Sequence, residues 1–109
     1  MIPERLRGLP LRRGTDGFSI AEANSLRSRV VGLARMPELP PGWGLHIPRC
    51  RSVHTFGMRF DLDLVFLGPN AEPVRVVRGV RPRRVVVCAS ARSVVELAAG
   101  GADRYLALL

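Results

Sequence analysis

The densest set of chemically active side chains lies in residues 54–67, which read H-T-F-G-M-R-F-D-L-D-L-V-F-L. This stretch contains His54, Asp61 and Asp63, and Glu96 follows later in the chain. A histidine beside carboxylates can transfer protons near neutral pH or bind a metal ion. One histidine with scattered acids, without an H-x-x-x-H or paired-cysteine motif, is a weak set of metal ligands. We therefore predict no metal and no cofactor, and acid–base chemistry stays as an alternative function.

Cys50 is a second candidate for chemistry. It is flanked by Arg49 and Arg51, whose charges would lower the pKa of its thiol, and His54 follows four residues later. These are the electrostatics of a nucleophile, but no oxyanion hole or third orienting group can be identified. Cys88 is the other cysteine, and with no export signal we predict two free, buried thiols. Whether neighbouring strands bring the two together stays open.

The charge of the chain is strongly one-sided. It has 17 basic residues, all of them arginine, against 9 acidic ones, for a net charge of +8. Such a balance favours acidic partners such as nucleic acid, acidic polysaccharide or an anionic membrane surface, although a solvated, like-charged surface is the alternative. Trp43 and Tyr105 are far apart and no stacking motif accompanies the charge, which argues against sequence-specific nucleic-acid recognition.

Eight arginines could line one anion-binding face, because guanidinium groups match phosphate and carboxylate geometry. They are Arg49, Arg51, Arg59, Arg75, Arg78, Arg81, Arg83 and Arg84. Five of them fall on one predicted strand and its turn, where they could instead form a solvated edge that prevents edge-to-edge pairing.

A central strand must position much of this chemistry. Its apolar face is formed by every second residue, namely Phe60, Leu62, Leu64 and Phe66. Asp63 lies on the other face and must be paired or hydrogen-bonded, because an unpaired buried charge is costly. It could be a general base or a ligand anchor. It could also be structural, accepting hydrogen bonds from the 55–59 loop or pairing with Arg35.

The remaining elements are expected to be short. Phe18–Ala23 is predicted as a strand, although Ser19 and Glu22 could form a capping box that begins a helix there. A helix capped by Asn24 or Ser25 would place Leu26, Val30 and Leu33 inward, and Gly32 would allow its end to press on a neighbour. Further strands are predicted at Leu45–Ile47, Pro73–Val80, Val85–Cys88, Val94–Ala98 and in the apolar segment 102–109, with a hairpin turn at 68–71.

These elements predict an α+β fold, with a curled, mainly antiparallel, half-barrel-like β-sheet and one short helix in the N-terminal half. Residues 1–16 are predicted to be an irregular basic arm, and residues 17–109 a single domain. No apolar run approaches the ~20 residues of a membrane span, and the first residues do not form a signal peptide. We therefore expect a cytoplasmic protein.

The order of short motifs resembles the bacterial and archaeal family called domain of unknown function 192. The matching residues are Arg29, Gly32, Leu33 and Arg35, then Met58, Leu62 and Asp63, then Glu96, Leu97 and Gly100. Asp61 stands where the family pattern has proline, and His54-Thr55-Phe56-Gly57 replaces its usual aromatic lead. The resemblance covers about residues 17–109. It implies a small fold with a curved, mainly antiparallel sheet, and it implies no activity.

The leading functional hypothesis is a non-enzymatic binding or accessory module. It would present a basic concave face, centred on His54, Arg59, Arg75 and Arg78, to an anionic ligand or protein partner. Its candidate ligand-binding residues are His54, Arg59, Asp63, Arg75, Arg78 and Glu96. The alternative is a small hydrolase-like enzyme that uses His54 and Asp63 with Cys50 or Glu96, which requires these side chains to converge in one pocket.

Overall fold

The computed structural model describes residues 2–13 and 18–109, apart from the side chains of Arg13, Leu26, Arg27 and Val30. The N-terminal half contains the 3-10 turn η1 (Glu4–Leu6), β1 (Leu11–Arg13), β2 (Ser19–Glu22), α1 (Leu26–Val31), β3 (Trp43–Pro48) and β4 (Ser52–His54). The second half contains β5 (Leu62–Leu67), β6 (Pro73–Val80), β7 (Val85–Val87), β8 (Ser93–Ala98) and α2 (Gly101–Leu106). No helix in the described part of the chain is both long and apolar enough to span a membrane.

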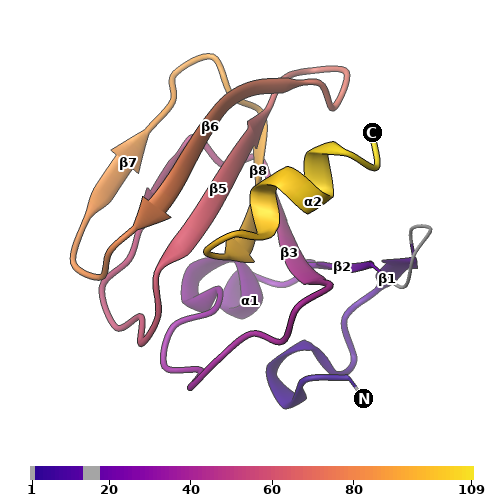
Figure 1. Ribbon diagram of the computed structural model, residues 1–109, viewed down its shortest axis with the longest axis vertical. Helices are drawn as coiled ribbons and strands as arrows, with labels where there is room; N and C mark the ends of the chain where they lie inside the picture. The colour runs from indigo at the N-terminus through magenta and orange to yellow at the C-terminus, as the bar shows by residue number, and fades with distance from the viewer. Residues whose placement is uncertain (1, 14–17) are drawn as a thin grey trace.

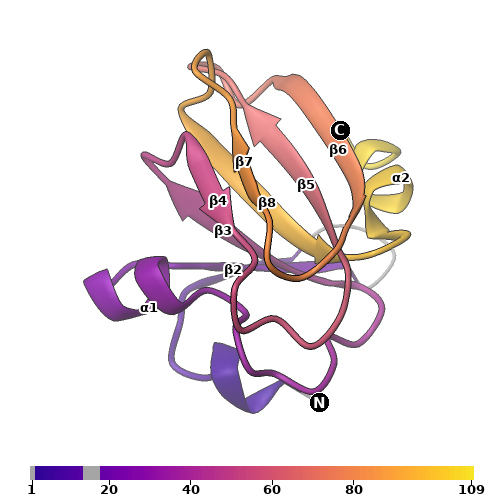
Figure 2. The ribbon, with the colours of Figure 1, turned by 90° about the vertical axis from the view of Figure 1, so that its left-hand side faces the viewer.

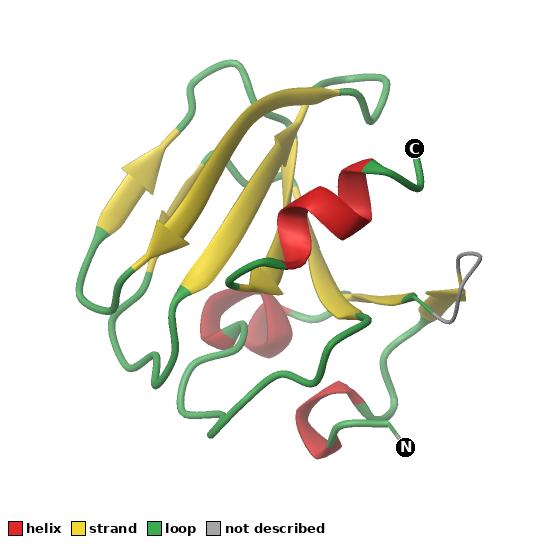
Figure 3. Ribbon diagram, viewed as in Figure 1, coloured by secondary structure: helices red, strands yellow, loops and turns green. Residues whose placement is uncertain are grey.

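One curled sheet of six strands dominates the fold, in the order β1-β2-β3-β8-β5-β6 (Figure 1). All neighbours in it are antiparallel except β2 and β3, which run parallel. Strands β4 and β7 form a separate antiparallel pair, which we call the β4–β7 ribbon. The described strands at the two ends of the sheet, β1 and β6, do not pair with each other, so the sheet stays open. The predicted fold class, a curled and mainly antiparallel sheet with a short helix in the N-terminal half, is confirmed (Figure 3).

The two faces of this sheet have different covers. On the ribbon face, an apolar cluster includes Leu45, Leu64 and Phe66, and Val53 and Val86 of the β4–β7 ribbon pack against them. The α2 face carries a second cluster covered by α2, with Ile20, Val65, Leu67, Val95, Leu97, Ala102 and Tyr105. Figure 2 shows α2 beyond β5 and β6, on the side away from β7. Successive residues of a central strand therefore alternate between two apolar clusters, one on each face of the sheet.

Several local predictions are confirmed. Residues 19–22 form a strand rather than a helix start, and Pro73–Val80 is a strand with the predicted bounds. Ser25 caps α1, because its side chain accepts from the Ser28 amide and the Ser28 hydroxyl accepts from the Ser25 amide. Leu33 is buried as expected, whereas the predicted inward positions of Leu26 and Val30 lie outside the described side chains.

Residues 2–13 differ from the predicted irregular arm. They contain η1 and β1, and β1 pairs with β2 over Leu11–Arg13. Leu6 is only 1% exposed and joins the ribbon-face cluster. The Arg5 guanidinium donates to the carbonyl oxygen of Gly32 at 3.1 Å, at the end of α1. Leucines spaced among the prolines and glycines give this segment enough apolar surface to pack, which composition alone did not reveal. Residues 1 and 14–16 of the predicted arm lie outside the described residues.

The strand predicted in residues 102–109 is wrong, because Gly101–Leu106 forms α2. Gly100 has a φ of 93°, a left-handed conformation that glycine adopts without strain, and it turns the chain from β8 into the helix. Ala102 and Tyr105, three residues apart, are the buried positions of α2. The apolar residues therefore follow a helical spacing, and the dense leucines at the end of the chain obscured it.

Candidate functional site

A small cavity of about 50 Å³ lies on the ribbon face, between the end of α1, the β4 region and β8. Its polar lining consists of Arg29, Cys50, Ser52, His54 and Glu96. Its remaining walls are Val31, Gly32, Leu33, Ala34, Ile47, Val53 and Met58. This volume is several times the ~10–15 Å³ that one water requires, so it accommodates a ligand group of a few non-hydrogen atoms. We call it the Glu96 cavity.

Strand register aims Glu96 into this cavity. In β8 it lies opposite Leu64 of β5 and Leu45 of β3, both on the ribbon face. The residue is 5% exposed, and its Oε1 atom is buried with no hydrogen-bond partner among the described residues. Burial raises the pKa of its carboxyl to about 7, because the charged form loses solvation, while a backbone hydrogen bond from Leu33 acts in the opposite direction. Glu96 can therefore change its protonation state near neutral pH.

Gly32 explains how α1 reaches this carboxylate so closely. A Cβ atom at this position would lie 3.0 Å from Glu96 Oε1, and Gly32 also has a positive φ of 54°. The predicted close approach of Gly32 to a neighbour is confirmed. Only a residue without a side chain fits against the carboxylate oxygen at this point without crowding it.

Cys50 lies in the same cavity, but it is not an activated nucleophile. Its thiol donates to the carbonyl oxygen of Ser52 at 3.2 Å. Burial raises the pKa of the thiol, Glu96 adds to that effect, and Arg29 opposes it. The prediction that Arg49 and Arg51 lower this pKa is wrong, since both arginines are exposed and solvent screens their charges. Both cysteines are free, with Cys88 buried and Cys50 half-buried.

Asp63 lies on the opposite side of the sheet from Glu96. Its strand partner is Leu97, on the α2 face. One carboxylate oxygen accepts from the Gly79 amide at 2.9 Å, and the other accepts from the amides of Gly100 and Ala102 at 3.0 Å each. These three hydrogen bonds offset the solvation that the carboxylate loses on burial in an apolar strand. This arrangement agrees with the structural interpretation of Asp63.

The partners predicted for Asp63 are nevertheless wrong. The 55–59 loop turns to another part of the chain, where the Thr55 hydroxyl donates to the Arg81 carbonyl at 2.7 Å and accepts from the Arg84 amide at 2.8 Å. Asp63 also cannot join His54 in one pocket, because it is enclosed on the α2 face while His54 lines the Glu96 cavity. The structure brings His54, Cys50 and Glu96 together and leaves Asp63 out.

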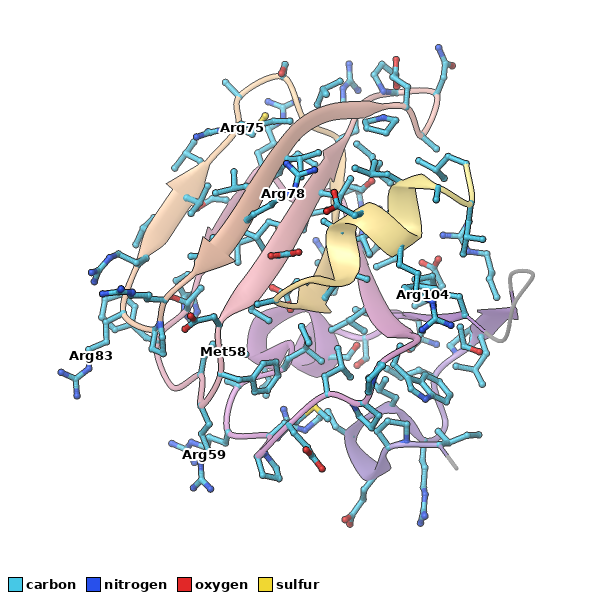
Figure 4. The ribbon with its side chains drawn as sticks, viewed as in Figure 1. Met58, Arg59, Arg75, Arg78, Arg83 and Arg104 are labelled. Carbon is cyan, nitrogen blue, oxygen red and sulfur yellow. The ribbon has the colours of Figure 1, made fainter. Side chains whose placement is uncertain are left out.

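Arg59, Arg75 and Arg78 do not share the predicted basic concave face. The Arg75 guanidinium donates to the Val87 carbonyl of β7 at 2.8 Å, whereas Arg78 forms an ion pair with Asp103 of α2 at 2.7 Å. Their partners lie on opposite sides of β6. Arg59 points away from the sheet at the opposite end of the molecule from Arg75 (Figure 4).

Another group of arginines does converge. Arg49, Arg51 and Arg92 line an open hollow of about 470 Å³, which we call the arginine hollow. Backbone hydrogen bonds hold their segments together, from the Cys50 amide to the Arg92 carbonyl at 3.1 Å and from the Cys88 amide to the Arg51 carbonyl at 2.8 Å. Sequence reasoning missed Arg92 in this group, because it follows the arginines at 49 and 51 by about forty residues and no motif marks it.

The described residues contain no group of three histidine, cysteine, aspartate or glutamate side chains able to hold a metal ion. The fold and cavity together define a class of protein, a small domain built on a curled β-sheet with one polar cavity beneath its short first helix. The chain belongs to the family DUF192, described as an uncharacterized ACR, whose model matches residues 10–106. That match confirms the resemblance seen in the sequence.

Two solved structures share this fold. One, described as "a putative transcription regulator" from Sinorhizobium meliloti 1021, has a TM-score of 0.71 and 19% identity over 81% of this chain and 74% of its own. The other, a protein of unknown function from Novosphingobium aromaticivorans DSM 12444, has a TM-score of 0.70 and 15% identity over 95% of this chain and 91% of its own. No curated protein matches the chain. At these identities the likeness concerns the fold alone.

Proposed function

We propose that this protein is a binding module for a small multivalent anion, carrying phosphoryl or carboxylate groups, and that the arginine hollow is its site. The supporting observation is that, of the residues that the structure describes, three arginines and no carboxylate line that hollow, namely Arg49, Arg51 and Arg92. Guanidinium groups bind such anions through paired, charge-assisted hydrogen bonds. This keeps the binding function expected from the sequence and relocates it from Arg59, Arg75 and Arg78.

The charges of the hollow are available to a ligand. Within the described part of the chain, none of its three arginines forms an ion pair, whereas Arg12 and Arg78 are paired with acids. The Arg51 Nε donates to the Ala91 carbonyl at 3.1 Å, which orients its guanidinium while leaving its terminal nitrogens for a ligand. A partly fixed side chain loses less conformational freedom on binding.

The hydrolase-like alternative has weaker support. It depended on His54 and Asp63 in one pocket, and Asp63 is enclosed elsewhere by three amides. The raised pKa of the Cys50 thiol leaves it mostly protonated, which disfavours nucleophilic attack. Binding rather than hydrolysis is therefore the function that the geometry supports best.

Calorimetric titration with pyrophosphate and with citrate, at low and at high salt, tests this proposal. We expect saturable binding that weakens as salt rises, and a loss of about tenfold or more in the double variant Arg49→Gln/Arg92→Gln. The matched control is Arg59→Gln/Arg83→Gln, which removes the same charge at exposed positions that do not line the hollow. Equal weakening in both double variants would show attraction to net charge alone and contradict a built site.

A further inference from the structure

Two buried polar atoms without hydrogen-bond partners belong to residues that line one cavity. Glu96 Oε1 and Arg29 Nε are both buried, and neither has a hydrogen-bond partner among the described residues. Glu96 and Arg29 both line the Glu96 cavity. Buried polar atoms in native proteins almost always have partners, so two exceptions at one cavity indicate that something else supplies the missing hydrogen bonds. None of the three arginines of the arginine hollow lines this cavity, so the two sites are separate.

We propose that the Glu96 cavity binds the uncharged end group of a small ligand that both donates and accepts hydrogen bonds, of the carboxamide type. Its N–H would donate to Glu96 Oε1, and its carbonyl would accept from Arg29. The two protein atoms have opposite hydrogen-bonding characters, and a primary amide carries the complementary pair within three adjacent atoms.

The charge around the cavity favours an uncharged group. Ionised Glu96 and Arg29 cancel, so a neutral ligand adds no charge to a half-buried site. A cation would face Arg29, and an anion would face Glu96 unless that carboxyl were protonated. The other groups that face the cavity are the Cys50 thiol, held protonated by burial, and His54 with Ser52 at its exposed side.

The shape of the cavity limits what enters. Its volume of about 50 Å³ accepts an end group of a few non-hydrogen atoms, and the rest of the ligand would leave past His54 and Ser52, both exposed. Leu33, Ile47 and Val53 supply apolar walls, which suit the methyl or methylene carbon next to an amide. Gly32 avoids crowding Glu96 Oε1, since any larger residue would place its Cβ 3.0 Å from that atom.

Proton linkage gives this assignment a distinctive signature. An N–H that donates to the carboxylate stabilises its ionised form, so the ligand lowers the pKa of Glu96 from its free value of about 7. Binding must then strengthen as pH rises through neutrality. A carboxylic acid bound to protonated Glu96 would show the opposite dependence.

The experiment uses acetamide, acetate and methylammonium as probes, with the backbone amides of Gly32, Leu33, Cys50 and Val53 followed by ¹H–¹⁵N NMR. We expect saturable shifts with acetamide, tighter binding above pH 7 than below it, and little response to the two charged probes. The labelled side-chain carboxyl carbon of Glu96 reports its pKa directly, and that pKa should fall when acetamide is present.

Two variants make the test decisive. Glu96→Leu replaces a buried carboxyl with an apolar side chain of similar size and is expected to stay folded, yet to weaken acetamide binding at least tenfold. Arg29→Met should weaken it as well, whereas Glu38→Gln, at an exposed acid outside the cavity, should not. The proposal is overturned if acetamide causes no saturable shifts, if it binds Glu96→Leu equally well, or if acetate binds preferentially with proton uptake.

Discussion

Asp63 and Glu96 are buried acids on neighbouring strands of the same sheet, but they face opposite sides of it and differ in how many hydrogen bonds their carboxylates accept. Asp63 faces α2 and is only 1% exposed, and three backbone amides saturate its carboxylate. Glu96 faces the β4–β7 ribbon at 5% exposure, and one of its oxygens has no partner in the described part of the chain. Burial alone therefore does not separate an acid whose hydrogen bonds are complete from one that has an oxygen without a donor. The number of donors around the carboxylate separates them.

The largest expected effect comes from removing the saturated acid. Asp63→Ala would leave the amides of Gly79, Gly100 and Ala102 without an acceptor at the junction of β5, β6 and α2. We expect a loss of about 3–5 kcal/mol in the free energy of unfolding, because buried donors stripped of a charged acceptor are costly. Urea denaturation followed by circular dichroism measures this. A loss below about 1 kcal/mol would break the comparison, since Asp63 would then not be the structural acid.

The next largest expected effect is a gain in stability when Glu96 is removed, and this gain depends on pH. The pKa of Glu96 rises from an ordinary 4.5 to about 7 on folding, so the folded state favours the protonated form. Its full stabilising contribution is present below pH 4.5 and is lost as pH rises through 7, a change on the order of 3 kcal/mol.

The variant Glu96→Leu should abolish this pH-dependent loss and should be more stable than the parent at pH 8. Urea denaturation of both proteins at pH 5 and pH 8 tests the sign, with Glu38→Gln as the control. If parent and Glu96→Leu lose stability in parallel between these values, Glu96 does not titrate as a buried acid.

The smallest effect uses a pair of glycines, one beside each acid. Gly32 and Gly100 both have positive φ, but a Cβ at Gly100 meets nothing within 4 Å, whereas one at Gly32 lies 3.0 Å from Glu96 Oε1. Gly100→Ala should cost about 1 kcal/mol from backbone strain in the left-handed region, and Gly32→Ala about 1 kcal/mol more, from crowding and from a ψ of −128° that lies outside that region. Thermal melts of both variants measure the difference. Equal costs would mean that Glu96 yields freely, and the cavity would then be softer than we infer.

The sequence predicted local features well. Alternation identified the apolar face of the central strand, the Pro73–Val80 partner strand had the correct bounds, and the glycine at 32 correctly indicated a close approach. The need of Asp63 for hydrogen-bond donors was also deduced correctly. Each of these depends on periodicity, on a turn signal or on the cost of burying one charge, and all of these can be evaluated over a few residues.

The site could not be predicted because distant segments assemble it. The donors to Asp63 come from residues 16, 37 and 39 positions away, and none has a side chain that marks it as a donor. Arg29 and Glu96 line one cavity, and Arg51 and Arg92 line one hollow, although about forty or more residues separate the members of each pair. Periodicity shows which face a residue occupies, but it does not show what lies across from that face.

The attachment of α2 to the middle of the sheet has a consequence for how the chain assembles. When the β5–β6 hairpin first forms, Asp63 can have only the Gly79 amide as a partner, since the amides of residues 100 and 102 are made later during synthesis. Burial of β5 therefore leaves the Asp63 carboxylate short of hydrogen-bond donors until α2 has been synthesised. Such late, long-range closure favours slow, all-or-none folding, and it leaves the nascent hairpin exposed to other chains in the meantime.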